Sequence, residues 1–160
     1  MLPIDGSFTG RIDFQQIIRD ALATAALEGW QHITLCDASF EDWPLGERVV
    51  IDSLNTWSKA GRSMTLLAKR YDTIIAKHPR FVTWRGRWSH IIEARGVSSA
   101  DAQDFPSAIY SPGWVMQRLD LVRGTGICST DPQRRLVLRE LLGEWQGKSS
   151  PAFAATTLGL

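Results

Sequence analysis

The sequence predicts an α/β fold in which a mixed, largely parallel sheet is flanked by helices. Helical and strand-like segments alternate over the first 95 residues, which favours parallel strands joined by crossover helices. Two short strand-like segments around Ser111-Pro112-Gly113 then indicate a hairpin, which makes the sheet mixed. With 160 residues, the chain is expected to form one domain over residues 1–160.

The first helix is expected after a loose lead-in over residues 1–12. Asp13 and Gln16 have the spacing of a capping box, in which two side chains bind free backbone N–H groups at a helix start. Apolar residues follow at helical spacing as far as Gly29, a residue type that often ends helices. The pattern therefore predicts that the helix begins at the capping box.

The middle of the chain continues the alternation of strands and helices. The predicted elements are strands over residues 31–37, 63–68 and 90–95, and helices over residues 47–60 and 71–78. Gly61 should close the second helix, and Pro79 should interrupt the third because the residue before a proline avoids helical backbone angles. Apolar residues at helical spacing beyond Pro79 predict that this helix restarts.

The C-terminal part begins with a loop over residues 96–106, followed by the hairpin and a strand near 124–129. Asp131-Pro132 has the residue types preferred at a helix start, so a final helix should run from there to about Gly147. The tail over residues 148–160 is apolar and lacks a clear period. It is expected to dock on its own subunit or on a partner.

The composition favours a cytoplasmic protein without a metal site. No apolar run approaches the roughly 20 residues that span a bilayer, and no leader peptide is recognisable. Cys36 and Cys128 lack metal-ligand spacing and lie in apolar runs, so we expect buried free thiols and no cofactor. Seven tryptophans supply large apolar anchors for a core or an interface.

Charge is unevenly distributed, although the formal net charge is only +1. Residues 62–95, here called the basic segment, hold eight basic and two acidic residues, whereas residues 1–61 hold nine acidic and four basic ones. Trp84 and Trp88 are interleaved with the arginines. This pattern fits phosphate contact and base stacking by a nucleic-acid-binding surface. The alternatives are an interface between subunits, or a solvated helix face whose tryptophans point into the core.

A second candidate site follows two predicted strands, because ligands of open α/β sheets bind at the carboxyl ends of strands. Asp37 and Asp42 follow the first strand, and Lys69 and Arg70 follow the second. Carboxylates facing a basic pair could bind a cation or a phosphorylated ligand. In the structural alternative, Asp37 ends its strand, Asp72 supports a helix start, and Arg70 pairs with one of them.

The three histidines do not form a recognisable catalytic pattern. His32 and His90 open predicted strands, and His78 precedes a proline. His90 and Glu93 have a spacing that would place them on opposite faces of a strand. We expect each histidine to have a packing or edge role.

The segment over residues 107–132, with two short strands, a turn of small residues and a helix start, resembles the C-terminal part of a phospholipase-D-like half-domain. That family carries His-x-Lys-x4-Asp there, and this segment has neither His nor Lys. The chain also resembles an uncharacterised bacterial family with Asp-Trp-Pro-Leu-Gly and the ending Ser-Pro-Ala-Phe-x-Ala-Thr-Thr-Leu-Gly-Leu. The first resemblance implies a phospholipase-D-like topology and, for a lone half-domain, a homodimer.

Together these observations predict a non-catalytic phospholipase-D-like domain that binds or scaffolds an unidentified ligand. One alternative is a phosphate- or nucleic-acid-binding module that uses the basic segment. A second is a cryptic phosphodiesterase that uses His78 or His90. The predicted ligand-binding residues are Asp37, Asp42, Lys69, Arg70, Arg80, Arg85 and Arg87.

Overall fold

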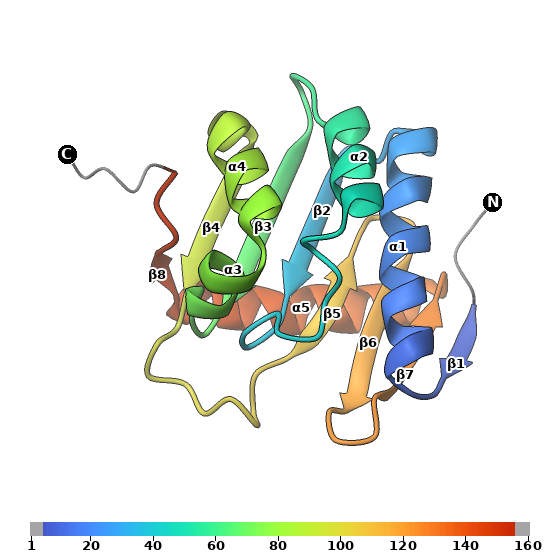
Figure 1. The fold of residues 1–160 in the computed structure, drawn as a ribbon. Helices are drawn as coiled ribbons and strands as arrows, with labels where there is room; N and C mark the ends of the chain where they lie inside the picture. Colours follow the sequence, from blue (N-terminus) through green and yellow to red (C-terminus); the bar gives the residue numbers. More distant parts are fainter. Residues whose placement is uncertain (1–4, 156–160) are drawn as a thin grey trace.

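The computed structural model describes residues 5–155, which are organised around one eight-stranded sheet with the order β1-β7-β6-β5-β2-β3-β4-β8 (Figure 1). The strands are β1 (Gly6–Phe8), β2 (His32–Cys36), β3 (Ser63–Ala68), β4 (Ile92–Gly96), β5 (Ser107–Tyr110), β6 (Val115–Asp120), β7 (Thr125–Ser129) and β8 (Ser150–Pro151). Strands from the first and last parts of the chain therefore form the two edges of the sheet.

The sheet is mixed, as predicted, but most of its pairings are antiparallel. Within the described residues, β2–β3 and β3–β4 are parallel. The other five pairings, which are β1–β7, β2–β5, β4–β8, β5–β6 and β6–β7, are antiparallel. The prediction of a largely parallel sheet is therefore wrong. Helices join β2 to β3 and β3 to β4, which are neighbours in the sheet, and they also join β1 to β2 and β7 to β8, which lie apart in it. In contrast, β5 to β7 form a meander that lies on the other side of β2.

The helices cover the two faces of the sheet unequally (Figure 1). They are α1 (Arg11–Glu28), α2 (Arg48–Trp57), α3 (Asp72–Lys77), α4 (Pro79–Arg87) and α5 (Pro132–Lys148). The first four lie on one face, and α5 crosses the other face alone. The larger core lies under the four helices and contains Phe14, Trp43 and Trp57, whereas the smaller one, under α5, contains Phe105 and Leu138.

Several predicted boundaries are confirmed because their signals were local. The strand over residues 63–68 and the hairpin of β5 and β6 are present. The Asp131 carboxylate caps α5 by accepting a hydrogen bond from the Arg134 N–H. Pro79 separates α3 from α4, and His78 before it has non-helical backbone angles (φ −126°, ψ 61°), as the constraint on residues before proline predicts.

Other boundaries differ from the prediction. The capping box at Asp13 is absent, because α1 begins two residues earlier after Gly10, whose φ of 92° suits glycine, and no side chain caps the helix. The second helix ends at Trp57, before Gly61. β4 begins at Ile92 because a short 3-10 turn precedes it. The lead-in contains β1, a strand too short to give an alternating pattern.

The apolar tail docks on its own subunit over residues 149–155, here called the C-terminal segment. β8 pairs with β4, and the Ala152 N–H donates to the Ala94 carbonyl at 3.1 Å. The Phe153 ring stacks on Tyr71 with 4.8 Å between ring centres. The rest of the predicted tail, residues 156–160, lies outside the described residues.

Candidate functional site

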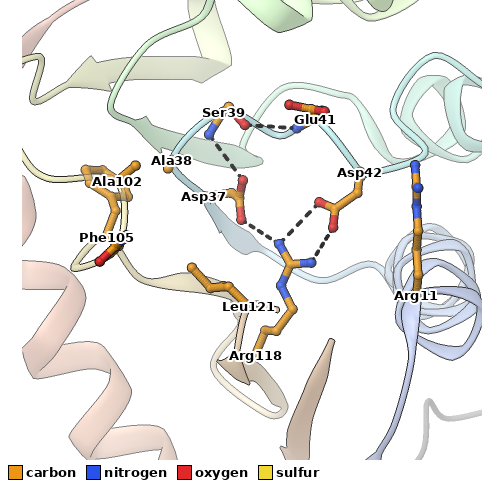
Figure 2. Close-up of a pocket in the computed structure, with 11 residues that line it drawn as sticks. Arg11, Asp37, Ala38, Ser39, Glu41, Asp42, Ala102, Phe105, Arg118 and Leu121 are labelled. Carbon is orange, nitrogen blue, oxygen red and sulfur yellow. Dashed lines mark hydrogen bonds and ion pairs between the residues drawn. The ribbon is translucent and has the colours of Figure 1, made fainter. Parts of the chain in front are cut away.

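A paired charge cluster lies at the carboxyl end of β2, where the sequence predicts a site (Figure 2). The Arg118 guanidinium, on β6, donates to Asp37 at 3.0 Å and to Asp42 at 2.5 Å. Asp37 is almost fully buried, whereas 29% of the Asp42 side chain is exposed. The prediction placed Asp37 and Asp42 together correctly but did not include Arg118.

Further contacts satisfy the remaining hydrogen-bonding groups of Arg118 and Asp37. Arg118 Nε donates to the Ser107 hydroxyl at 3.2 Å, and the guanidinium lies 4.0 Å from the centre of the Phe14 ring. The second oxygen of Asp37 accepts the N–H groups of Ser39 and Phe40, which closes the turn after β2. A buried charge is tolerated when it is paired and hydrogen-bonded in this way. The cluster therefore ties β2, β6 and α1 together.

An open pocket of about 370 Å³ lies against this cluster. Its walls include Ser39, Glu41 and Arg11, and the loop between β4 and β5 contributes Ala102 and Phe105 (Figure 2). This loop carries the chain from β4 across to the far side of β2, and the crossing point in open α/β sheets is a common ligand position. The exposed edges of Asp42 and Glu41 could accept hydrogen bonds from a ligand.

Lys69 and Arg70 lie outside this pocket. Their backbone N–H groups donate to the Ala38 carbonyl, and the Arg70 side chain is exposed. The alternative in which Arg70 pairs with Asp37 or Asp72 is wrong for the described residues, where Arg118 is the partner of Asp37. The basic pair consequently does not face the two carboxylates.

The basic segment divides into exposed and buried arginines. Arg80 and Arg87 are exposed on α4, beside a groove of about 230 Å³ between α2 and α4. This α2/α4 groove is lined by Ile51, Asn55, Arg80, Thr83, Trp84 and Arg87. In contrast, Arg85 is buried, and its Nε donates to the Phe153 carbonyl at 3.1 Å. The predicted site residues on α4 therefore do not form one surface.

The tryptophans of this segment are turned inward to different degrees. Trp84 is buried, and its indole N–H donates to the Ser58 hydroxyl at 3.0 Å. Trp88 is half-buried and lies against the His90 ring, with 5.5 Å between ring centres. Trp84 is therefore a core residue, which removes the expected stacking platform for bases at that position.

The histidines contact neutral groups. His32 lies between the Ser63 and Thr34 hydroxyls, at 2.8 and 2.9 Å, and burial lowers its pKa. Burial also lowers the pKa of His78, which contacts the Phe40 carbonyl. His90 lies in the 3-10 turn and not on β4, so the expectation that it opens the strand is wrong; with Glu93 it lines an open pocket of about 360 Å³. The 3-10 turn before β4 changes the strand register assumed in that prediction.

Both cysteines are buried free thiols, as expected. Burial raises the pKa of Cys128 to about 12 and also raises the pKa of Cys36, so neither thiol is activated. No group of three or more potential ligands among residues 5–155 could hold a metal ion. Over the same residues, no helix combines the length and the apolarity needed to cross a bilayer.

Comparisons with known proteins inform the fold. No family model matches the chain, and no curated protein matches it. Among solved structures, it is similar to TrmBL2, which is described as an archaeal chromatin protein with a novel mode of DNA binding, at 15% identity and a TM-score of 0.66. The match covers 95% of this chain and 56% of TrmBL2, so the chain spans little more than half of that protein. At this identity the likeness establishes a shared fold.

Proposed function

We propose that this chain is a nucleic-acid-binding domain that contacts phosphates through the α2/α4 groove. The observation that carries the proposal is the pair of exposed guanidiniums, Arg80 and Arg87, on the α4 side of this groove. Arg80 donates to the Gly46 carbonyl, and no carboxylate among residues 5–155 forms an ion pair with either side chain. Their charges are therefore available to an anionic ligand.

The spacing of the two arginines suits a polyanion better than a single phosphate. They are seven residues apart on one helix, which corresponds to two turns or roughly 10.5 Å along the axis. The exposed Lys77, at the end of α3, adds a third positive charge before Arg80. Thr83 lines the groove with the two arginines, and cations spaced in this way can follow a sugar–phosphate backbone without reading its bases.

The likeness to TrmBL2 supports this proposal at the level of the fold. That protein is described as binding DNA, and the shared region is about half of its length. Because Trp84 is buried, phosphate contact is the recognition mode that we propose, with little dependence on base sequence.

We also propose that the scaffold has a phospholipase-D-like topology without catalysis. β6 carries Met116 and Arg118 on its core-facing side, in the region where the resemblance implies a nucleophilic His and a Lys. We therefore expect no turnover of bis-p-nitrophenyl phosphate. Turnover that is lost on His90→Ala would support the phosphodiesterase alternative. The homodimer stays a prediction that light scattering tests.

Fluorescence anisotropy with a short labelled duplex and the matching single strand tests nucleic-acid binding. With three phosphate contacts, affinity for the duplex should fall roughly 40-fold between about 50 and 200 mM salt, because the logarithmic slope is about −0.9 per contact. Arg80→Gln with Arg87→Gln should weaken binding to unrelated sequences equally and make the salt dependence shallower.

Arg134→Gln with Arg139→Gln is the matched control, because it removes two exposed arginines from α5, on the opposite face of the sheet. This variant has the same net charge as the groove variant, and it should bind like the unmodified protein. Equal losses in the two variants would show a general charge effect and contradict the proposed groove. Absence of binding at about 50 mM salt would contradict the function itself.

A further inference from the structure

Arg85 is a buried cation with an incomplete set of partners. Only 7% of the residue is exposed. Its Nε donates to the Phe153 carbonyl, and its guanidinium carbon lies 5.5 Å from the centre of the Phe153 ring. One terminal nitrogen, Nη1, is buried and has no hydrogen-bond partner among residues 5–155. The group that Arg85 contacts is therefore neutral, although the side chain is charged.

This arrangement is unusual because buried charges are normally paired with opposite charges. No carboxylate among residues 5–155 lies within ion-pair distance of Arg85. Burial lowers the pKa of Arg85, yet an arginine keeps its proton in proteins. A buried polar atom without a partner requires an explanation, and a bound ion is one of the established explanations.

The C-terminal segment is what closes this site. The segment is attached by the two-residue strand β8, by the Phe153–Tyr71 stack, and by hydrogen bonds from Arg95 to Ser149. Phe153 has a φ of 50°, in the left-handed region that costs a non-glycine residue conformational energy. When the C-terminal segment is docked, Phe153 is strained and the Arg85 cation is desolvated without an anionic partner among residues 5–155. Both features raise the free energy of the docked state.

We propose that Arg85 is the anion-binding group of a phosphate site, and that the C-terminal segment is a reversible cover over it. Bonds from a guanidinium to a phosphate oxygen are charge-assisted and stronger than bonds to a neutral carbonyl. A phosphate group can therefore compete with the Phe153 carbonyl for Arg85. Because Nη1 is buried in the closed state, the segment must move before the ligand enters.

This site is separate from the α2/α4 groove. Arg85 is five residues after Arg80, so the two side chains leave α4 about 140° apart around its axis. Arg85 faces the C-terminal segment, whereas Arg80 and Arg87 line the groove. The inference does not depend on the proposed nucleic-acid function, and either can fail alone.

Calorimetric titration of the full chain with inorganic phosphate, at constant ionic strength set by chloride, tests the site. Phe153→Ala removes the stack and should raise phosphate affinity by about tenfold, because apparent affinity scales with the open fraction. Adding Arg85→Gln to that variant should abolish the gain. Adding Arg139→Gln, which removes an exposed arginine from α5 on the opposite face of the sheet, should leave the gain intact.

Phe153→Leu is the second variant in case the alanine substitution impairs folding, since it keeps apolar volume and loses the aromatic stack. Hydrogen exchange at the Ala152 amide measures opening directly, because this N–H binds the Ala94 carbonyl in the closed state. Phosphate should speed exchange there in the unmodified protein. No gain in affinity in either Phe153 variant, or a gain that survives Arg85→Gln, would overturn the proposal.

A 5′-phosphorylated oligonucleotide and its unphosphorylated twin distinguish a terminal nucleic-acid phosphate from free phosphate as the ligand. If the phosphorylated oligonucleotide binds more tightly, and if Arg85→Gln removes this difference, the ligand of the site is the terminal phosphate of a nucleic-acid strand. Loss of duplex binding in Arg80→Gln with Arg87→Gln, with unchanged phosphate affinity, shows that the two sites act independently.

Discussion

Arg118 and Arg85 are equally buried, at 7% exposure each, but their surroundings are opposite. Arg118 has two carboxylates, a hydroxyl and an aromatic face as partners. Among residues 5–155, Arg85 has one neutral carbonyl and an aromatic ring as partners, and its Nη1 has no hydrogen-bond partner. Burial alone therefore does not distinguish an arginine that stabilises the fold from one that can still bind a ligand. The two are distinguished by how many of the guanidinium nitrogens already have hydrogen-bond or ion-pair partners.

Replacing Arg118 should have the largest effect of the changes proposed here. Arg118→Met keeps most of the side-chain volume but leaves the Asp37 charge buried without its partner. Removing one member of a buried ion pair costs about 3–5 kcal/mol, and we expect about 3 kcal/mol because Asp42 is partly solvated. Urea unfolding measures the loss of stability.

Two further variants make this test specific. Adding Asp37→Asn and Asp42→Asn to Arg118→Met should restore part of the stability, because no unpaired carboxylate then remains. Arg123→Met removes an arginine whose side chain is 80% exposed, and its free energy of unfolding should stay within about 0.5 kcal/mol. If Arg118→Met costs no more than Arg123→Met, the charge cluster does not stabilise the fold.

His78 extends the comparison to a buried base that has no anionic partner in the part of the chain that the structure describes. Burial, the largest cause, and Lys77 lower its pKa, while the Phe40 carbonyl opposes them, so the folded state favours the neutral ring. The unfolded chain takes up a proton as the pH falls below about 6.5, and the folded state does so only at lower pH. Stability contributed by the neutral ring is therefore present above about pH 6.5 and is lost below it.

The slope from one such group cannot exceed about 1.4 kcal/mol per pH unit. His32, whose pKa is also lowered by burial, should add to the loss in the same direction. Urea unfolding between about pH 7 and 5 should show a shallower pH dependence in His78→Asn. The exposed His90, replaced in the same way, serves as the control. An unchanged slope in His78→Asn would show that His78 is not responsible.

Replacing Arg85 should have the smallest effect on stability. Arg85→Met removes a buried cation that lacks a carboxylate partner among residues 5–155, and an apolar residue of similar volume avoids the desolvation cost. We expect the free energy of unfolding to change by less than about 1 kcal/mol or to increase. A loss as large as that of Arg118→Met would mean that Arg85 has a structural partner of equal strength.

The sequence predicted those parts of the fold that depend on local signals. Asp131-Pro132 fixes the start of α5, and the apolar run over residues 63–68 fixes β3. β1 and β8 escaped detection because strands of three and two residues have no period, and they form through pairing with β7 and β4. The predominance of antiparallel strand pairings could not be predicted, because it depends on the tertiary path of the loop after β4. This loop places β5 beside β2, where it pairs in the antiparallel direction.

The candidate site was predicted in part for a similar reason. Asp37 and Asp42 are close in sequence, so their proximity could be inferred. Arg118 lies 81 and 76 residues away from them and joins them only once β6 enters the sheet. One signal was present: in β6, Met116 and Arg118 occupy buried alternate positions, so a charge faces the core and requires a buried partner.

β8 forms one edge of the sheet and determines whether another strand can pair there. It covers the outer edge of β4 with two residues, and one of them, Pro151, has no N–H to offer to a further strand. Exposed strand edges recruit other chains into growing sheets, and a proline on the outermost strand blocks one of the hydrogen bonds that such growth needs. The small strand that holds the C-terminal segment in place should therefore also protect the protein against aggregation through this edge.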